Sequence, residues 1–247
     1  MRRLLLAACV AVQSFGLAFG APADEAQAII ERAIKAHGGL DRLSRVHADR
    51  VMNKGFLIVN GKETPFLAET TVQLPGQFRN VIHLQGERKT VFVQILNGDK
   101  IYFTIDGQPQ KVDDTLSAEV HETMQLNQAI RLAPLLMDKA YTIEPLGEVT
   151  VEGQPALGVK ATAKGRREVR LFFNKETGLL MKTEHTTDDG AGKEIVQEEI
   201  YSNFEDVQGY RRPMKLAAYR NGKKVIEAEV IEVKYLDKAD DAEFAKP

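Results

Sequence analysis

Closely spaced turn signals constrain the fold of this chain more than any other feature. From Val46 onward, short runs of β-branched and aromatic residues alternate with clusters of Gly, Pro, Asn and Asp. The clusters of the first half are Asn60-Gly61, Leu74-Pro75-Gly76, Gln85-Gly86, Asn97-Gly98-Asp99 and Asp106-Gly107. Turns that recur about every 10 residues are typical of antiparallel strands joined in a meander.

The runs between these turns predict about twelve strands. In the first half they are Val51 to Val59, Glu63 to Leu74, Phe78 to Leu84, Lys89 to Leu96 and Lys100 to Ile105. In the second half they are Tyr141 to Val151, Ala156 to Ala163, Glu168 to Phe173, Leu179 to Thr187, Glu194 to Phe204, Arg212 to Arg220 and Lys223 to Tyr235. No linker-like stretch divides the chain, so we expect one domain over residues 21–247.

Two segments carry a helical pattern instead. Asp24 to His37 places its apolar residues on one face, and Gly38-Gly39 follows as a stop signal. The second segment, about Thr115 to Met137, interrupts the meander and becomes strongly apolar in its second half. Asp113 or Asp114 can cap its start, Ser117 can cap a second start, and Pro134 kinks or divides it.

Several strands alternate between apolar and polar residues. One example is the run in which Phe78, Ile82 and Leu84 alternate with Arg79 and His83. We therefore expect one face of the sheet to be apolar and the other to be exposed to solvent. In the second half, Val169, Leu171 and Phe173 oppose Arg170 and Asn174. A sheet of this size must curl or close. The inserted helix is the candidate cover for its apolar concave face.

The N-terminus predicts export. Met1-Arg2-Arg3 is followed by a mostly apolar run from Leu4 to Leu17 and by Ala18 and Gly20, small residues at the −3 and −1 positions of a cleavage site. This pattern is typical of a cleaved signal peptide over residues 1–20, and it places the mature protein in the periplasm of a bacterium. The stretch ending at Cys9 also spells a lipobox, but the apolar run before it is too short for that signal.

No catalytic or metal-binding motif stands out. His121-Glu122 begins like a zinc-protease motif, but Gln125 occupies the position of the second ligand. The chain has no nucleophile elbow, phosphate-binding loop or dinucleotide fingerprint. A formal net charge of −2 argues against nucleic-acid binding, and a single Cys excludes a disulfide framework. We therefore expect no enzyme activity, no metal and no cofactor.

The apolar face is the remaining candidate for function. Each of its side chains, taken singly, is readily explained as core. As a set beneath a movable helix, they would form a cavity for alkyl chains, which gain about 0.8 kcal/mol per buried CH₂. The candidate ligand-binding residues are Phe78, Ile82, Leu84, Phe103, Met124, Ile130, Met137, Leu171 and Phe173.

The order of helix, meander, inserted helix and meander resembles the LolA/LolB-like periplasmic lipoprotein-carrier superfamily. The local matches are Leu74-Pro75-Gly76-Gln77-Phe78-Arg79 and Asn97-Gly98-Asp99-Lys100-Ile101-Tyr102-Phe103. A third, Phe204 to Pro213, is similar to a stretch in outer-membrane lipoprotein-sorting relatives. The resemblance implies a mainly β (α+β) fold, an unclosed β-barrel with a helical lid, and Phe78 near the cavity mouth.

The resemblance also implies a carrier function. A hydrophobic cavity would hold the acyl chains of a lipidated protein or another lipid, and an inner- or outer-membrane protein would take part in handover. The chain departs from the family pattern at Leu74, where carriers have a basic residue that latches the lid. Arg79 points to the opposite face from Phe78 and is a poor substitute. The alternative is a protein-interaction or envelope-stress sensor module of the same fold. In either case we expect a monomer.

Overall fold

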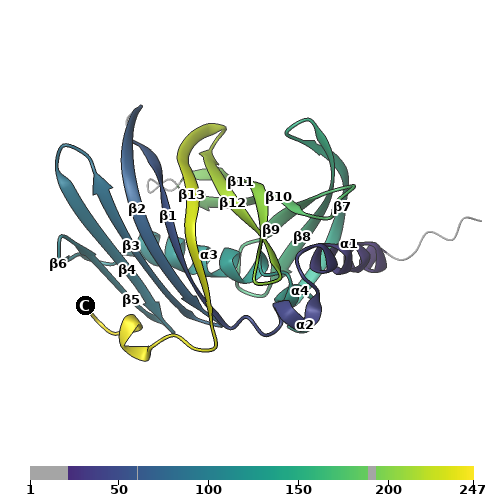
Figure 1. Cartoon of the computed structure of the whole chain (residues 1–247), viewed down its shortest axis with the longest axis horizontal. Helices are drawn as coiled ribbons and strands as arrows, with labels where there is room; N and C mark the ends of the chain where they lie inside the picture. The colour runs from purple at the N-terminus through teal and green to yellow at the C-terminus, as the bar shows by residue number, and fades with distance from the viewer. Residues whose placement is uncertain (1–21, 60, 189–192) are drawn as a thin grey trace, which may run out of the picture.

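The computed structural model describes residues 22–59, 61–188 and 193–247. In this part of the chain, thirteen strands form one antiparallel sheet in the order β6-β5-β4-β3-β2-β1-β13-β12-β11-β10-β9-β8-β7. The sheet curls strongly but is not closed, and β6 and β7 are its two edges (Figure 1). The predicted fold class is confirmed. The predicted signal peptide lies outside the described residues.

The strand boundaries follow the turn signals closely. The first six strands are β1 Ala48–Val59, β2 Lys62–Gln73, β3 Gln77–Gln85, β4 Lys89–Asn97, β5 Lys100–Ile105 and β6 Gln108–Pro109. The others are β7 Tyr141–Val151, β8 Gln154–Ala163, β9 Val169–Asn174, β10 Leu180–Asp188, β11 Glu194–Val207, β12 Tyr210–Arg220 and β13 Lys223–Leu236. The short β6 is the one strand of this sheet that the sequence did not predict.

The two predicted helical segments correspond to α1 Pro22–Ala36 and to the pair α3 Asp114–Ala129 and α4 Ala133–Met137. The structure adds α2 Leu40–Leu43 and a final 3₁₀ turn, η1 Asp241–Phe244. Asp113 is the N-cap of α3, and its Oδ1 accepts a hydrogen bond from the Leu116 amide at 2.9 Å. Ser117 starts no second helix. The division comes at Leu132, whose positive φ of 62° ends the helical path before Pro134 enters the first turn of α4.

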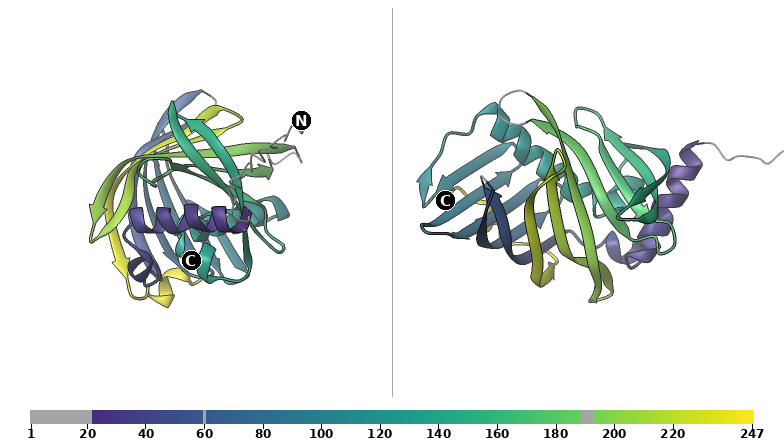
Figure 2. Two further views of the ribbon diagram at one scale, coloured as in Figure 1. Left: turned by 90° about the vertical axis from the view of Figure 1, so that its right-hand side faces the viewer. Right: turned by 90° about the horizontal axis from the view of Figure 1, so that it is seen from above.

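The helix α1 fills the concave face at one end of the sheet. Its apolar stripe, which includes Ile30 and Ile34, packs on side chains from β7 to β10. Leu171 and Phe173 lie at the centre of this contact and are 0% and 2% exposed. Figure 2 shows α1 lying across this end of the curled sheet. We call this region, formed by β7 to β10 and α1, the closed half.

The helix α3 lies over the concave face nearer the other end. Val120 and Met124 pack on Val72 of β2, Phe78 of β3 and Leu96 of β4. Strand pairing confirms the predicted alternation, because Val72 pairs with Phe78 and Phe78 pairs with Leu96 on one face. We call the region formed by β1 to β5 the open half, because α1 does not reach it.

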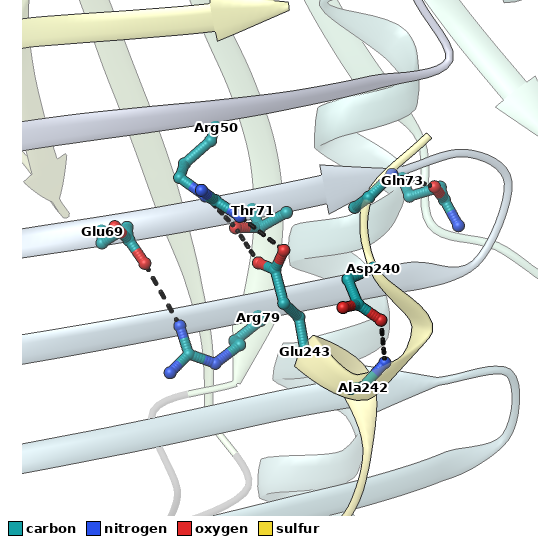
Figure 3. Close-up of polar contacts among 9 residues, drawn as sticks. Arg50, Glu69, Thr71, Gln73, Arg79, Asp240, Ala242 and Glu243 are labelled. Atoms are coloured by element: carbon teal, nitrogen blue, oxygen red, sulfur yellow. Dashed lines mark hydrogen bonds and ion pairs between the residues drawn. The ribbon is translucent and has the colours of Figure 1, made fainter. Parts of the chain in front are cut away.

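The C-terminal tail packs on the convex side of the open half. Phe244 of η1 is fully buried against Ala48 and Ile95. Figure 3 shows Glu243 beside Arg50 and Thr71, and it forms an ion pair with Arg50 and accepts a hydrogen bond from Thr71 Oγ1 at 3.2 Å. Further along, the Ala239 amide donates to Gln73 Oε1 at 2.8 Å and Asn97 Nδ2 donates to the Phe244 carbonyl at 3.2 Å. The tail therefore binds the outer surface of β1 to β4.

Candidate binding cavity

A cavity of about 360 Å³ lies between the concave face and the C-terminal half of α3. The alternation of the strands explains its lining, since Asp49, Val51 and Asn53 of β1 share one face with Thr70 and Val72 of β2. The helix contributes Thr123, Leu126 and Asn127 from above, and the turn that follows it adds Ile130 and Arg131. Strands β10 to β13 add His185, Gln197, Glu199, Tyr201, Arg212, Lys215, Leu216, Val230 and Tyr235.

Three charged side chains meet at one end of the cavity. Asp49, which is 3% exposed, accepts hydrogen bonds from Arg131 Nη2 at 2.7 Å and from Arg212 Nη1 at 2.9 Å. Burial lowers the pKa of Arg131 despite the neighbouring carboxylate. Burial also acts to lower the pKa of Arg212, but Asp49 and Tyr235 outweigh it and raise that pKa. We call Asp49, Arg131 and Arg212 the charged centre.

A second polar group lies on β10 and β11. The Tyr201 hydroxyl donates to Glu199 Oε2 at 2.6 Å and lies 3.2 Å from Thr183 Oγ1. Burial raises the pKa of Glu199, although the bonds from Tyr201 and Gln197 partly oppose the shift. Burial also raises the pKa of Tyr201, and the adjacent carboxylate adds to that effect. The negative charge of Glu199 is therefore disfavoured in this environment.

His185 borders the cavity on β10. Burial lowers its pKa to about 4, and the positive charges of Arg167 and Arg220 add to the shift. The imidazole is therefore neutral at pH 7. Its Nδ1 is buried and has no hydrogen-bond partner among the described residues, and the same holds for Nε of Arg131. The cavity wall thus contains two buried nitrogen atoms that no side chain or backbone group of this part of the chain satisfies.

Beyond the cavity, the concave face of the open half is apolar. We call this surface the apolar wall; it is formed by the buried Phe66 and the half-buried Ile82, Leu84, Phe92 and Phe103. Ile82, Leu84 and Leu216 all pack against the buried cluster of Phe66, Ala68 and Ala228, and Leu216 also lines the cavity. The rings of Phe92 and Phe103 stack with centroids 6.3 Å apart and planes 8° from parallel. The apolar wall and the cavity therefore meet at this cluster.

Polar contacts hold the helical cover in place. Gln128 Nε2 donates to the Pro75 carbonyl at 2.6 Å, and Gln125 donates to the Arg167 carbonyl. Glu122 forms an ion pair with Arg167 at 2.6 Å between Oε1 and Nε. Leu74, at the position where the related carriers have a basic residue, packs with the cluster of Val72, Phe78 and Met124 instead. Apolar packing and amide-to-carbonyl bonds therefore attach α3 near this turn.

The structure divides the candidate ligand-binding residues into three groups. Phe78 and Ile130 line the cavity, and Met124 packs beside Phe78. The members on the apolar wall are Ile82, Leu84 and Phe103. The remaining three lie apart from the cavity lining: Leu171 and Phe173 belong to the closed half, and Met137 is 60% exposed at the end of α4.

Sequence reasoning missed the charged centre. Its members come from β1, from the turn after α3 and from β12, so no local motif joins them. Two signals were present in the sequence. Asp49 lies two residues before Val51 on the same strand, so both side chains lie on the same face of the sheet. This places a carboxylate on the apolar face. Arg131 is the one charged residue of the apolar stretch between Met124 and Met137.

Within residues 22–59, 61–188 and 193–247, no helix is both long and apolar enough to cross a membrane. Nor do three or more His, Cys, Asp or Glu side chains in these ranges gather in a metal-binding arrangement.

Comparison of the sequence with protein-family models and with curated proteins finds no match. Solved structures do share the fold. A LolA superfamily protein from Nitrosomonas europaea superposes with a TM-score of 0.57 at 15% identity, covering 90% of this chain and 97% of that protein. A DUF1329 family protein from Desulfovibrio piger gives 0.55 at 11% identity, covering 89% and 97%.

A third structure supports the same assignment. A putative outer membrane lipoprotein-sorting protein domain from Vibrio parahaemolyticus superposes with a TM-score of 0.54 at 10% identity, covering 90% of this chain and 97% of that one. The protein therefore has the fold of LolA superfamily and lipoprotein-sorting proteins. At these identities the likeness concerns the fold, and the function must be argued from the cavity.

Proposed function

We propose that the protein is a periplasmic binding or carrier protein that holds acyl chains of lipoproteins or other lipids between the curled sheet and α3. The continuity of the cavity with the apolar wall carries this proposal. A cavity of about 360 Å³ is within the usual size of small-molecule sites, and the wall extends it along the concave face. Each CH₂ group buried there would contribute about 0.8 kcal/mol to binding.

We also propose a role without catalysis. The carboxylates of the cavity are engaged in contacts with neighbouring side chains, because Asp49 accepts from Arg131 and Arg212 and Glu199 accepts from Tyr201. The fold shared with the lipoprotein-sorting domain agrees with a carrier role, and a carrier of this kind would act in the periplasm after removal of residues 1–20. The bound molecule would be a lipid or a lipidated protein, received from or delivered to a membrane protein.

Native mass spectrometry of protein purified from the periplasm tests this proposal first. We expect a retained lipid, fatty acid or lipopeptide that solvent extraction identifies. In solution, a fluorescent fatty acid should bind the protein, and Ile82→Asp should weaken that binding at least about tenfold by placing a charge on the apolar wall.

His83→Asp is the matched control for this test, because it introduces the same charge on the neighbouring, exposed residue of the opposite face. It should leave probe binding unchanged. A ligand-free mass together with no probe uptake by the wild-type protein would contradict the proposal.

A second candidate function is a protein-interaction module of the same fold. A groove of about 660 Å³ near the β1–β2 and β12–β13 hairpins favours it. Phe56 and Ile231 line this groove and are 43% and 45% exposed. If the protein binds no lipid, and Phe56→Asp abolishes a protein complex recovered from the periplasm while Ile82→Asp does not, this second function would replace the first.

A further inference from the structure

We propose that the ligand is a long-chain amphiphile with an anionic head group, which binds at the charged centre while its alkyl chain lies on the apolar wall. This inference rests on the proposed function and deepens it, because it assigns the chemical class and the orientation of the bound molecule.

The charges that line the cavity favour an anion. Four basic side chains contribute to the lining, namely Arg131, Arg211, Arg212 and Lys215, against the two carboxylates of Asp49 and Glu199. One carboxylate, Asp49, is shared by two guanidinium groups. Burial raises the pKa of Glu199, which disfavours the negative charge of the second carboxylate. A partly enclosed site with surplus positive charge attracts anions.

The charged centre also contains an N–H donor that has no acceptor among the described residues. A guanidinium group has five N–H donors, and buried donors without acceptors are costly. The Nε of Arg131 is buried without a partner among the described residues, and the side chain is 12% exposed. Arginine N–H groups bind carboxylate and phosphate oxygens with favourable geometry. An acidic head group would therefore supply the acceptors that this cluster lacks.

The position of the charged centre relative to the apolar wall sets the length of the ligand. Asp49 pairs with Val72, and Gly55 of the same strand pairs with Phe66 of the apolar wall. Six residues of β-strand extend about 20 Å at 3.3 Å per residue. Asn53, Thr70 and Asn80 lie between the two regions on the same face. A molecule that contacts both ends must therefore have a long alkyl chain.

Binding of three amphiphiles with the same chain to the wild-type protein tests the head group. Displacement of a fluorescent fatty acid is measured with hexadecanoate, its methyl ester and hexadecyltrimethylammonium, each below its aggregation concentration. We expect hexadecanoate to bind at least about tenfold more tightly than the methyl ester, because it alone brings a negative charge that can form ion pairs with the arginines. The cation should bind most weakly.

The outcomes separate the two proposals. Equal affinities for all three would overturn the anionic head group and leave the carrier function intact. No binding of any of them would contradict both. Displacement of the probe by acetate at the same concentrations as hexadecanoate would overturn the amphiphile and leave a site for small anions. A hexadecyl phosphate that matches hexadecanoate would support the proposal and extend the head group to phosphate.

Two variants of the charged centre should change hexadecanoate affinity in opposite directions. Arg131→Gln removes a positive charge and should weaken binding about tenfold or more, whereas Asp49→Asn releases both arginines and should strengthen it. Neither should change the affinity for the methyl ester by more than about twofold. If the charged centre only stabilised the fold, both variants would weaken the binding of both compounds, and that result would overturn the proposal.

Arg79→Gln is the matched control. Arg79 also forms an ion pair with a carboxylate, Glu69, at 3.3 Å, but on the convex face, as Figure 3 shows. Its replacement should leave both affinities unchanged. Circular dichroism establishes that each variant is folded. If Asp49→Asn does not fold, the series of head groups on the wild-type protein still decides the question.

Discussion

The two halves of the concave face differ in what covers them. In the closed half, α1 packs on β7 to β10 and leaves Leu171 and Phe173 almost without exposure. In the open half, α3 covers Val72 and Phe78 but leaves Phe103 half-buried. Both halves have the same strand alternation and similar apolar residues. The comparison teaches that alternation identifies the inner face of a curled sheet, whereas a covering helix decides whether that face is core or binding surface.

The largest effect that we predict concerns the closed half. Phe173→Ala should lower the free energy of unfolding by about 3–5 kcal/mol, because α1 and the sheet enclose the ring on all sides. Urea denaturation measures this change. If the free energy of unfolding fell by less than about 1 kcal/mol, the closed half would be able to collapse around the space left by the ring. The closed half would then not be the more tightly packed of the two halves.

Protonation of His185, which borders the cavity on β10 of the closed half, should have the next largest effect. His185 has a pKa of about 4 in the folded protein and an ordinary value of 6.5 when unfolded, so the unfolded chain binds more protons between these values. The free energy of unfolding should therefore fall as the pH decreases from about 6.5 to 4, by up to about 3 kcal/mol. Glu199 acts in the opposite sense, since its pKa is raised.

Denaturation of wild type and His185→Gln over this pH range isolates the histidine contribution. The stability difference between the two proteins should change with pH only below about 6.5. If the stabilities of the two proteins ran parallel over the whole pH range, His185 would be solvated in the folded protein, and the expected contribution would be absent.

The smallest change in stability is expected on the apolar wall. Phe103→Ala should lower the free energy of unfolding by about 1 kcal/mol, because the ring is half-buried and stacks on Phe92 alone among aromatic rings of the described chain. It should nevertheless weaken binding of a fluorescent fatty acid about fivefold, which fluorescence titration measures. A loss of stability equal to that of Phe173→Ala, with unchanged probe binding, would show that the open half is also core.

Much of the fold was predictable because its signals are local. The Asn-Gly and Asp-Gly turns fixed the strand boundaries within three residues, and Asp113 was one of two predicted caps. The break in the inserted helix was expected at Pro134, but it occurs earlier, at Leu132, because Pro134 is well suited to the first turn of a new helix. The two-residue β6 has too few residues to produce an alternating pattern.

The candidate site was predictable only in its apolar part. Phe78 and Ile130 lie in the cavity lining, on the side that alternation and helical spacing indicated, and their role in ligand binding stays a prediction. Leu171 has the same alternation, yet α1 covers it, and no pattern in either segment reveals that they meet. The pairing of Arg131 and Arg212 with Asp49 depends on contacts between residues 82 and 163 positions apart, which a single sequence does not encode locally.

The C-terminal tail has a consequence for the mechanics of the open half. A curled sheet whose concave face borders a cavity would ordinarily flex or collapse into that cavity. Here Phe244 and Glu243 hold β1 to β4 from the outer surface, so the stiffness of this region comes from the side opposite the cavity. The shape of the cavity would therefore depend on contacts of the tail rather than on the molecule that we propose it binds.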